Sequence, residues 1–366
     1  MRGLPEVPTA ATVVGRVLLP MGVETILVCE AQVPLVEGGA ESHVRQLVAQ
    51  LKARGYRAGL VSVPFKWYPK EEILAHAAAW RLLDLSESNG QRIDLVIGTK
   101  FPSYFVRHPN KVTWLIHQYR AAYELCGTEY SDFGDSEQDV DLRHRLFTID
   151  RQMLRESRRL YANAGNTARR LEKYLGLCAE PLYHPPRLAA RLAPGPYGDY
   201  VLSVGRIESI KRVDLLVRAM RYVDRPVRLV VVGEGTQRAA VERLAVQEGL
   251  ADRVEFLGAA DDDTLLSLYA GALAVLYPPF DEDYGYVTIE AFLCAKPVLT
   301  AQDSGGTLEF VEDGINGRVL AAEPEPFGAA VNDLAKDRAK ASSLGDAGRE
   351  RAKTITWDGV IQKLVG

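Results

Sequence analysis

The sequence predicts an α/β protein built from two Rossmann-like domains, each a parallel sheet with helices on both faces. With 366 residues, the chain is too long for one ordinary hydrophobic core. Short apolar segments alternate with segments of helical periodicity, which favours parallel strands joined by helices. This alternation stops in a Pro- and Gly-rich segment, residues 184–196, and then starts again. Such an interruption is typical of a linker between domains.

The composition narrows the class of protein. Hydrophobic residues make up 47% of the chain and charged residues 25%, as in ordinary globular proteins. The four cysteines lie far apart without metal-ligand spacing, which predicts reduced thiols in a cytoplasmic protein. The sequence has no run of 18 apolar residues to span a bilayer, and no charge pattern indicates a nucleic-acid partner. Residues 1–22 match no element, and we expect a poorly ordered extension there.

The first domain is predicted over residues 23–190. An apolar strand is followed by a loop that holds Gly38 and Gly39, and then by a helix that ends at Gly55. Two glycines before a helix N-terminus let the backbone approach a phosphate or sugar closely, although they also fit a simple tight turn. The predicted strands cover residues 25–30, 58–63, 95–97, 112–116 and 161–164, with a helix at 71–85.

His117 directly follows the strand at 112–116. Ligands of parallel sheets bind beyond the carboxyl ends of the strands, so this position favours a role in binding or catalysis. A packed histidine satisfied by the backbone is the alternative. Aromatic residues such as Tyr104 and Tyr119 lie in the loops of the same rim, and their side chains suit a sugar, lipid or glycan acceptor.

Basic residues are concentrated further along this domain. Residues 141–173 carry nine basic and four acidic side chains. Residues 1–195 carry 25 basic and 21 acidic side chains, whereas residues 196–366 carry 19 and 27. A solvated helix face accounts for the basic segment, and so does contact with an acceptor phosphate or a membrane surface. Peripheral association with the inner membrane face therefore stays an open expectation.

The second domain is predicted over residues 197–352, before a final apolar segment at 353–366. After its first strand, Arg206 and Lys211 lie five residues apart near a helix start. Arginine binds a diphosphate through its bidentate fork and lysine adds a point charge, although such a pair is also a common surface feature. Strands are predicted at 200–205, 227–232, 254–257, 272–277 and 298–300, and helices at 213–222, 237–249, 261–269, 325–336 and 340–353.

The segment at 278–297 forms the turn from a buried strand into a helix. Two of its carboxylates are Glu282, which lies before the helix, and Glu290, which lies about a turn and a half inside it. They can face one ligand from two depths. Between them, Gly285 lets the backbone N–H groups of the helix start approach an anion. This combination suits a sugar diphosphate better than a metal.

Together these elements resemble the signature of the retaining GT-B glycosyltransferases of glycosyltransferase family 4, also described as glycosyl transferases group 1. The elements are Gly38-Gly39-Ala40-Glu41, His117, Arg206 with Lys211, and Glu282 with Glu290. The resemblance covers nearly the whole chain from residue 25. It implies a GT-B fold, in which two Rossmann-like domains face each other across a cleft and a C-terminal helix crosses back to the first domain.

The resemblance also implies roles for single residues. The implied catalytic residues are His117, Glu282, Arg206 and Lys211: the two cations bind the donor diphosphate, Glu282 the transferred sugar, and His117 lies beside that sugar. Glu290 would hold the nucleotide ribose. The remaining donor contacts are Gly38, Gly39, Arg253, Val254, Gly258, Tyr284, Gly285, Tyr286 and Val287, and the acceptor side holds Tyr104, His117 and Tyr119.

One departure from the family concerns Asp283 and Tyr284, where many members have glycine and phenylalanine. The segment also spells Asp281-Glu282-Asp283, which in GT-A enzymes would bind a divalent metal. Because Arg206 and Lys211 already supply positive charge, we expect no metal cofactor.

The expected function is transfer of a sugar from a UDP- or GDP-sugar to a hydroxyl of a glycan, a lipid-linked glycan or a small molecule, as in polysaccharide biosynthesis. Two alternatives stay open. One is a nucleotide-sugar epimerase or hydrolase on the same fold, and the other is a non-catalytic nucleotide-sugar-binding protein. The sequence does not indicate an oligomeric state.

Overall fold

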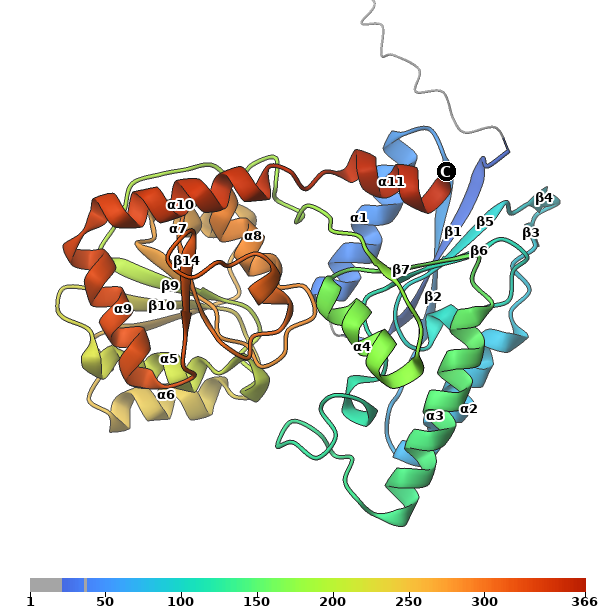
Figure 1. Cartoon of the computed structure of the whole chain (residues 1–366), viewed down its shortest axis with the longest axis horizontal. Coiled ribbons are helices and arrows are strands. Elements are labelled where there is room, and N and C mark those ends of the chain that lie inside the picture. Colours follow the sequence, from blue (N-terminus) through green and yellow to red (C-terminus); the bar gives the residue numbers. More distant parts are fainter. Residues whose placement is uncertain (1–21, 36–37) are drawn as a thin grey trace, which may run out of the picture.

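The computed structural model describes residues 22–35 and 38–366, which form two lobes side by side (Figure 1). The predicted N-terminal extension lies outside the described residues, apart from Gly22.

The N-terminal lobe holds a six-stranded sheet in the order β2-β1-β5-β6-β7-β8, and every neighbouring pair is parallel. The strands are β1 (Thr25–Gln32), β2 (Arg57–Pro64), β5 (Leu95–Gly98), β6 (Lys111–Leu115), β7 (Arg159–Ala162) and β8 (Glu180–Pro181). The helices are α1 (Gly39–Ala53), α2 (Ile73–Ala79), α3 (Glu137–Arg155) and α4 (Gly165–Leu175). A small hairpin of β3 (Glu87–Ser88) and β4 (Gln91–Arg92) projects from this lobe.

The C-terminal lobe holds a second parallel sheet, in the order β11-β10-β9-β12-β13-β14. Its strands are β9 (Tyr200–Val204), β10 (Arg228–Val232), β11 (Val254–Gly258), β12 (Ala274–Leu276), β13 (Val298–Ala301) and β14 (Gly317–Leu320). Its helices are α5 (Val213–Ala219), α6 (Arg238–Gln247), α7 (Asp262–Gly271), α8 (Tyr286–Leu293), α9 (Pro324–Lys336) and α10 (Arg338–Ala352). Two parallel sheets in two lobes confirm the predicted architecture.

Burial explains why these segments are strands. Every residue of β5 and of β13 is buried, as expected for a parallel sheet that is covered by helices on both faces. Strand β2 lies at the sheet edge, and its residues alternate between more and less accessible positions. Strands β8 and β14, which are short and lie at the sheet edges, were not predicted from the sequence. Their strand conformation is defined by pairing, of β8 with β7 and of β14 with β13, and the local sequence does not indicate it.

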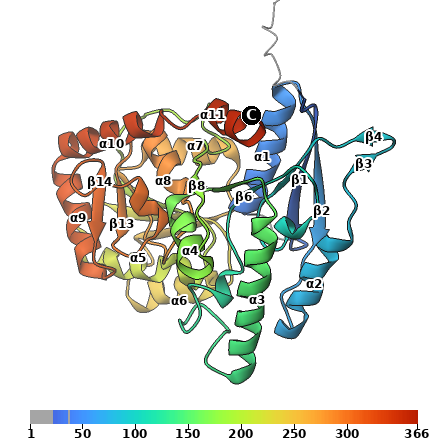
Figure 2. The same ribbon diagram turned by 45° about the vertical axis from the view of Figure 1, so that its right-hand side comes forward.

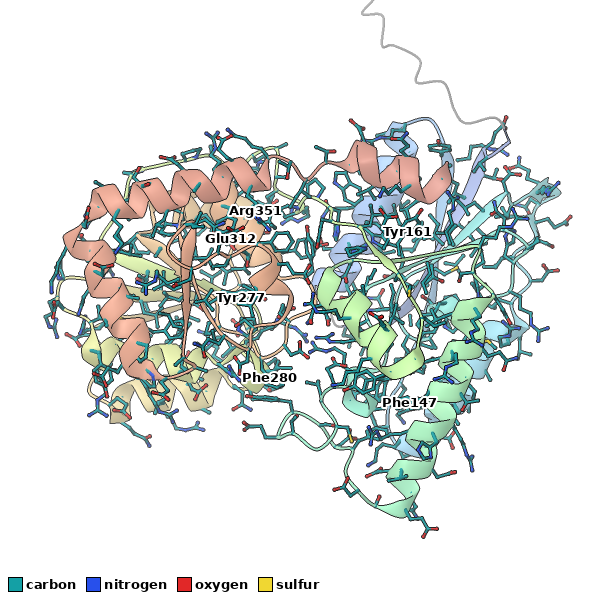
Figure 3. The ribbon with its side chains drawn as sticks, viewed as in Figure 1. Phe147, Tyr161, Tyr277, Phe280, Glu312 and Arg351 are labelled. Carbon is teal, nitrogen blue, oxygen red and sulfur yellow. The ribbon has the colours of Figure 1, made fainter. Side chains whose placement is uncertain are left out.

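Helix α11 (Trp357–Val365) leaves the C-terminal lobe and packs beside α1 of the N-terminal lobe (Figures 1 and 2). Its buried residues Trp357, Val360, Ile361 and Leu364 join the apolar cluster between α1 and the sheet. Tyr161, labelled in Figure 3, donates a hydrogen bond from its hydroxyl to the carbonyl oxygen of Lys363 at 3.0 Å. The predicted crossing of the C-terminal helix is therefore present.

In the part of the chain that the structure describes, no helix combines the length and the apolar character needed to cross a membrane.

Candidate active site

A cleft of about 420 Å³ lies between the two lobes, at the carboxyl ends of strands from both sheets. It is lined by residues that follow β1, β6 and β7 in one lobe and β9 and β12 in the other. Ten residues that the sequence analysis selected line this cleft: Gly38, Gly39, His117, Arg206, Lys211, Glu282, Tyr284, Gly285, Tyr286 and Val287.

Two cations of the cleft, Arg206 and Lys211, come from the segment after β9. Gly205 adopts a φ of 136°, which lets the chain turn sharply before Arg206. The Arg206 side chain is exposed and makes no hydrogen bond or ion pair with any described residue. Its guanidinium is therefore available to an anion in the cleft.

Lys211, in contrast, is already paired. Its ammonium contacts a carboxylate oxygen of Glu282 and lies 3.3 Å from the hydroxyl of Tyr277, which itself donates to Glu282 at 3.0 Å. Burial opposes ionisation of Glu282, but the charge of Lys211 outweighs this effect and lowers the pKa of the carboxyl. Glu282 therefore stays charged at neutral pH and holds Lys211 in the cleft. Tyr277 is labelled in Figure 3.

The N-terminus of α8 forms another wall of the cleft. Gly285 precedes the helix with a φ of 79°, and a Cβ atom there would lie 3.0 Å from the hydroxyl oxygen of Thr307. Both facts favour glycine. The first backbone N–H groups of a helix have no partner within it, so Tyr286 and Val287 present donors together with the positive end of the helix dipole.

His117 reaches the cleft from the opposite lobe. Its Nδ1 atom lies 2.7 Å from the carbonyl oxygen of Gln118. Because a carbonyl only accepts hydrogen bonds, Nδ1 carries the proton and Nε2 keeps its lone pair. Burial lowers the pKa of His117. The charge of Asp283 raises this pKa, whereas the positive charges of Lys100 and Arg120 lower it further, and the net effect is a lowered pKa. His117 is therefore neutral at neutral pH and can accept a hydrogen bond.

Glu290 does not line the cleft in this structure. Its carboxylate accepts a hydrogen bond at 2.7 Å from the hydroxyl of Tyr269, on α7, and burial raises its pKa. It lies on the same helix as the cleft-lining Tyr286 and Val287 but further from its start.

Four other residues selected from the sequence have structural places instead. The guanidinium of Arg253 is buried and donates to the carbonyl oxygens of Met220, Val223 and Val227. Val254 packs in the apolar core of its lobe. Gly258, at the end of β11, faces Glu234 and Arg238 outside the cleft.

Tyr104 is completely buried in the core of the N-terminal lobe, so an acceptor could not reach it.

An ion-pair network across the lobes was not expected. Asp283 pairs with Arg170 of α4 and lies 3.5 Å from Arg120, and both arginines donate to the carbonyl oxygen of Asp281. Burial opposes the charge of Asp283, but Arg120 and Arg170 prevail and lower its pKa to about 2. The sequence showed Asp283 as a departure from the family. The sequence around Asp283 did not indicate that Arg120 and Arg170 are its partners, because both arginines lie over a hundred residues earlier in the chain.

Comparison with known proteins identifies the C-terminal lobe. The family model described as glycosyl transferases group 1 matches residues 192–351. The chain contains a glycosyl transferases group 1 domain. This group 1 domain carries Arg206, Lys211 and the segment from Glu282 to Glu290.

Relatives and solved structures extend the comparison to both lobes. A D-inositol 3-phosphate glycosyltransferase of Nocardia farcinica is 32% identical over 59% of this chain and 53% of its own length. The chain spans about half the length of the curated relatives it matches.

Sucrose-phosphate synthase of Thermosynechococcus elongatus is 20% identical with a TM-score of 0.69, over 93% of this chain and 97% of the other. HepE of Anabaena, solved with UDP and glucose, is 18% identical with a TM-score of 0.68, over 93% and 98%. The group 1 domain and the N-terminal lobe together therefore have the GT-B fold of these glycosyltransferases.

Proposed function

We propose that the protein is a metal-independent, retaining glycosyltransferase of glycosyltransferase family 4. It moves a sugar from a UDP- or GDP-sugar to a hydroxyl of a glycan, a lipid-linked glycan or a small molecule. One observation carries this proposal: Arg206 and the Lys211–Glu282 pair face Gly38, Gly39 and His117 across a single cleft. The group 1 domain and the similarity to HepE, which was solved with UDP and glucose, support it.

The charges of the cleft suit a departing diphosphate. During transfer, the bond between the sugar C1 and the diphosphate oxygen breaks while C1 bonds to the acceptor oxygen on the same face. The acceptor proton passes to the departing phosphate oxygen. Arg206, Lys211 and the N–H groups at the start of α8 stabilise the negative charge that develops on this leaving group. His117 orients the sugar by accepting a hydrogen bond from one of its hydroxyls at Nε2.

The carboxylates of residues 281–283 support a mechanism without a metal. Each is already engaged by a cation: Asp281 lies 3.0 Å from Arg170, Glu282 pairs with Lys211, and Asp283 pairs with Arg170. A divalent ion would have to displace these partners. Glu282 instead holds the sugar through its second oxygen.

Turnover of the donor by single variants tests this assignment. A charge-assisted hydrogen bond contributes about 1.5–3 kcal/mol, so Arg206→Ala and Lys211→Ala should each lower kcat/KM by roughly 10- to 150-fold. Arg228→Ala is the matched control, because Arg228 begins β10 at the opposite end of the same sheet and pairs with an exposed glutamate at 3.3 Å.

Activity of Arg206→Ala and Lys211→Ala within a few-fold of the control would contradict the proposal. The assay uses UDP- and GDP-sugars with a panel of acceptors, among them an inositol phosphate, which the name of the Nocardia relative indicates. Product analysis with donor alone separates transfer from hydrolysis or epimerisation, since only transfer requires the acceptor.

A further inference from the structure

A second cavity opens beside the cleft, on the N-terminal lobe. We call it the side pocket and define it by Phe65, Trp67, Phe101, Gln118 and Tyr119, together with Lys100. It shares His117 and Arg120 with the cleft, so a molecule in the side pocket borders the same histidine as a sugar in the cleft. Its volume is about 220 Å³, below the roughly 300–1,000 Å³ of pockets for drug-sized ligands. The side pocket therefore suits a single ring-sized group.

The walls of the side pocket are aromatic. The ring of Phe65 lies 5.6 Å from that of Phe101 and 6.3 Å from that of Tyr119, and Phe101 and Tyr119 are 5.7 Å apart. These three rings pack against one another and form one aromatic wall of the side pocket. Trp67 stands at the pocket with 39% of its surface exposed, so part of its indole is free to pack on a ligand. Such walls favour an apolar or aromatic ring.

The cations of the side pocket are all engaged by protein groups. Lys100 is buried and pairs with the buried carboxylate of Glu41. Arg120 donates from Nε to Glu124 at 2.5 Å and from Nη2 to the carbonyl oxygen of Asp281 at 2.6 Å. An anionic ligand would compete with these partners and gain no free cation among the described lining residues. The charge distribution therefore favours a neutral ligand.

One polar group of the side pocket lacks a partner. The side chain of Gln118 is 1% exposed, and its amide nitrogen makes no hydrogen bond within residues 22–35 and 38–366. A buried donor without a partner is costly, and a ligand oxygen that reached it would remove this cost. The side pocket thus combines aromatic walls with one unused hydrogen-bond donor.

We infer that the side pocket binds the acceptor of the proposed transfer, and that this acceptor is an uncharged molecule carrying an apolar ring next to its hydroxyl groups. The inference rests on the proposed function for the identity of the reaction. The ring packs against the aromatic wall of Phe65, Phe101 and Tyr119 and against the exposed part of the Trp67 indole. An oxygen of the acceptor takes the hydrogen bond of Gln118, and its reacting hydroxyl lies toward His117 and the cleft.

Three glucose derivatives test the inference without a donor. Phenyl β-glucoside carries an apolar ring, methyl β-glucoside lacks it, and glucose 6-phosphate adds negative charge. By titration calorimetry, we expect phenyl β-glucoside to bind at least about ten-fold more tightly than methyl β-glucoside. Glucose 6-phosphate should bind no more tightly than methyl β-glucoside. Equal affinity for the two glucosides, or a preference for the phosphate, would overturn the inference.

Two variants link the binding to the side pocket. Trp67→Ala should weaken binding of phenyl β-glucoside by about five-fold or more and leave methyl β-glucoside within about two-fold. Tyr222→Ala is the control, because Tyr222 is a similarly exposed aromatic residue, at 45%, on the other lobe. An unchanged affinity in Trp67→Ala would place the ring elsewhere and overturn the inference.

Turnover measured on the same samples separates this inference from the proposed function. Sugar transfer by a protein that binds both glucosides alike would leave the proposed function standing and refute the neutral, ring-bearing acceptor. Tight, Trp67-dependent binding of phenyl β-glucoside with no transfer from any nucleotide sugar would refute the proposed function and keep the binding site.

Discussion

His43 and His184 lie buried against each other next to the cleft, with ring centroids 4.1 Å apart. His43 comes from α1, and His184 comes from the segment between the lobes and contacts the hydroxyl of Tyr286 through Nε2. Nε2 of His43 and Nδ1 of His184 have no partner among the described residues. Burial lowers the pKa of both, that of His43 to about 3. Both imidazoles are therefore neutral where α1 meets α8.

This burial predicts how stability depends on pH. An unfolded histidine binds a proton below about pH 6.5, whereas folded His43 stays neutral down to about pH 3. Between these values the unfolded state binds more protons, so His43 lowers the free energy of unfolding as pH falls. His43→Asn lacks this titrating group. Between pH 6 and pH 4, the free energy of unfolding of the wild type should therefore fall, relative to that of His43→Asn, by about 1.4 kcal/mol for each pH unit. Urea denaturation at stepped pH measures this, and parallel pH profiles would contradict it.

At the scale of elements, helix α11 ties the two lobes together. Trp357 begins the helix and packs edge-on against Trp114 of β6, with ring centroids 6.2 Å apart. The other end is held by Arg159 of β7, which donates to the carbonyl oxygen of Gly366 at 2.6 Å. The chain thus leaves the N-terminal lobe near residue 190, builds the C-terminal lobe and returns.

Removing the anchor of α11 should be costly. Trp357→Ala leaves a cavity between α11 and β6 and should lower the free energy of unfolding by about 3–5 kcal/mol. Gln362→Ala, on the exposed face of the same helix, should change it by less than about 0.5 kcal/mol. Denaturation of both variants measures the difference. If Trp357→Ala were as stable as Gln362→Ala, the packing of α11 on the N-terminal lobe would not contribute to the free energy of unfolding as proposed.

The elements also show how far sequence reasoning reaches. Central strands such as β5 and β13 were predicted to within one residue, because burial on both faces demands a continuous apolar run. Arg206, Lys211 and Glu282 were predicted near strand ends, which are local features of a sequence, and the structure places all three in one cleft. Arg253 was predicted to contact the donor, whereas its guanidinium donates to three main-chain carbonyls in the structure. These contacts depend on how a loop folds over it, which the sequence did not indicate.

At the scale of the whole molecule, the lobes are joined by charges that no local pattern could pair. Arg170 of α4 meets Asp283, and Glu309 accepts hydrogen bonds from the N–H of Gly165, at 2.8 Å, and from the hydroxyl of Tyr183, at 2.7 Å. The carboxylate of Glu309 thus lies at the N-terminus of α4, where the helix dipole favours negative charge. These contacts depend on how the lobes dock, and they bring His117 and Glu282 to one cleft.

The central claim is that this cleft holds the diphosphate of a nucleotide sugar between the two lobes. A crystal structure of the protein with a UDP- or GDP-sugar tests it most directly. The account predicts the diphosphate within hydrogen-bonding distance of Arg206, Lys211 and the first N–H groups of α8, with the sugar between Glu282 and His117. A nucleotide bound away from these residues, in any other cavity of either lobe, would contradict the account.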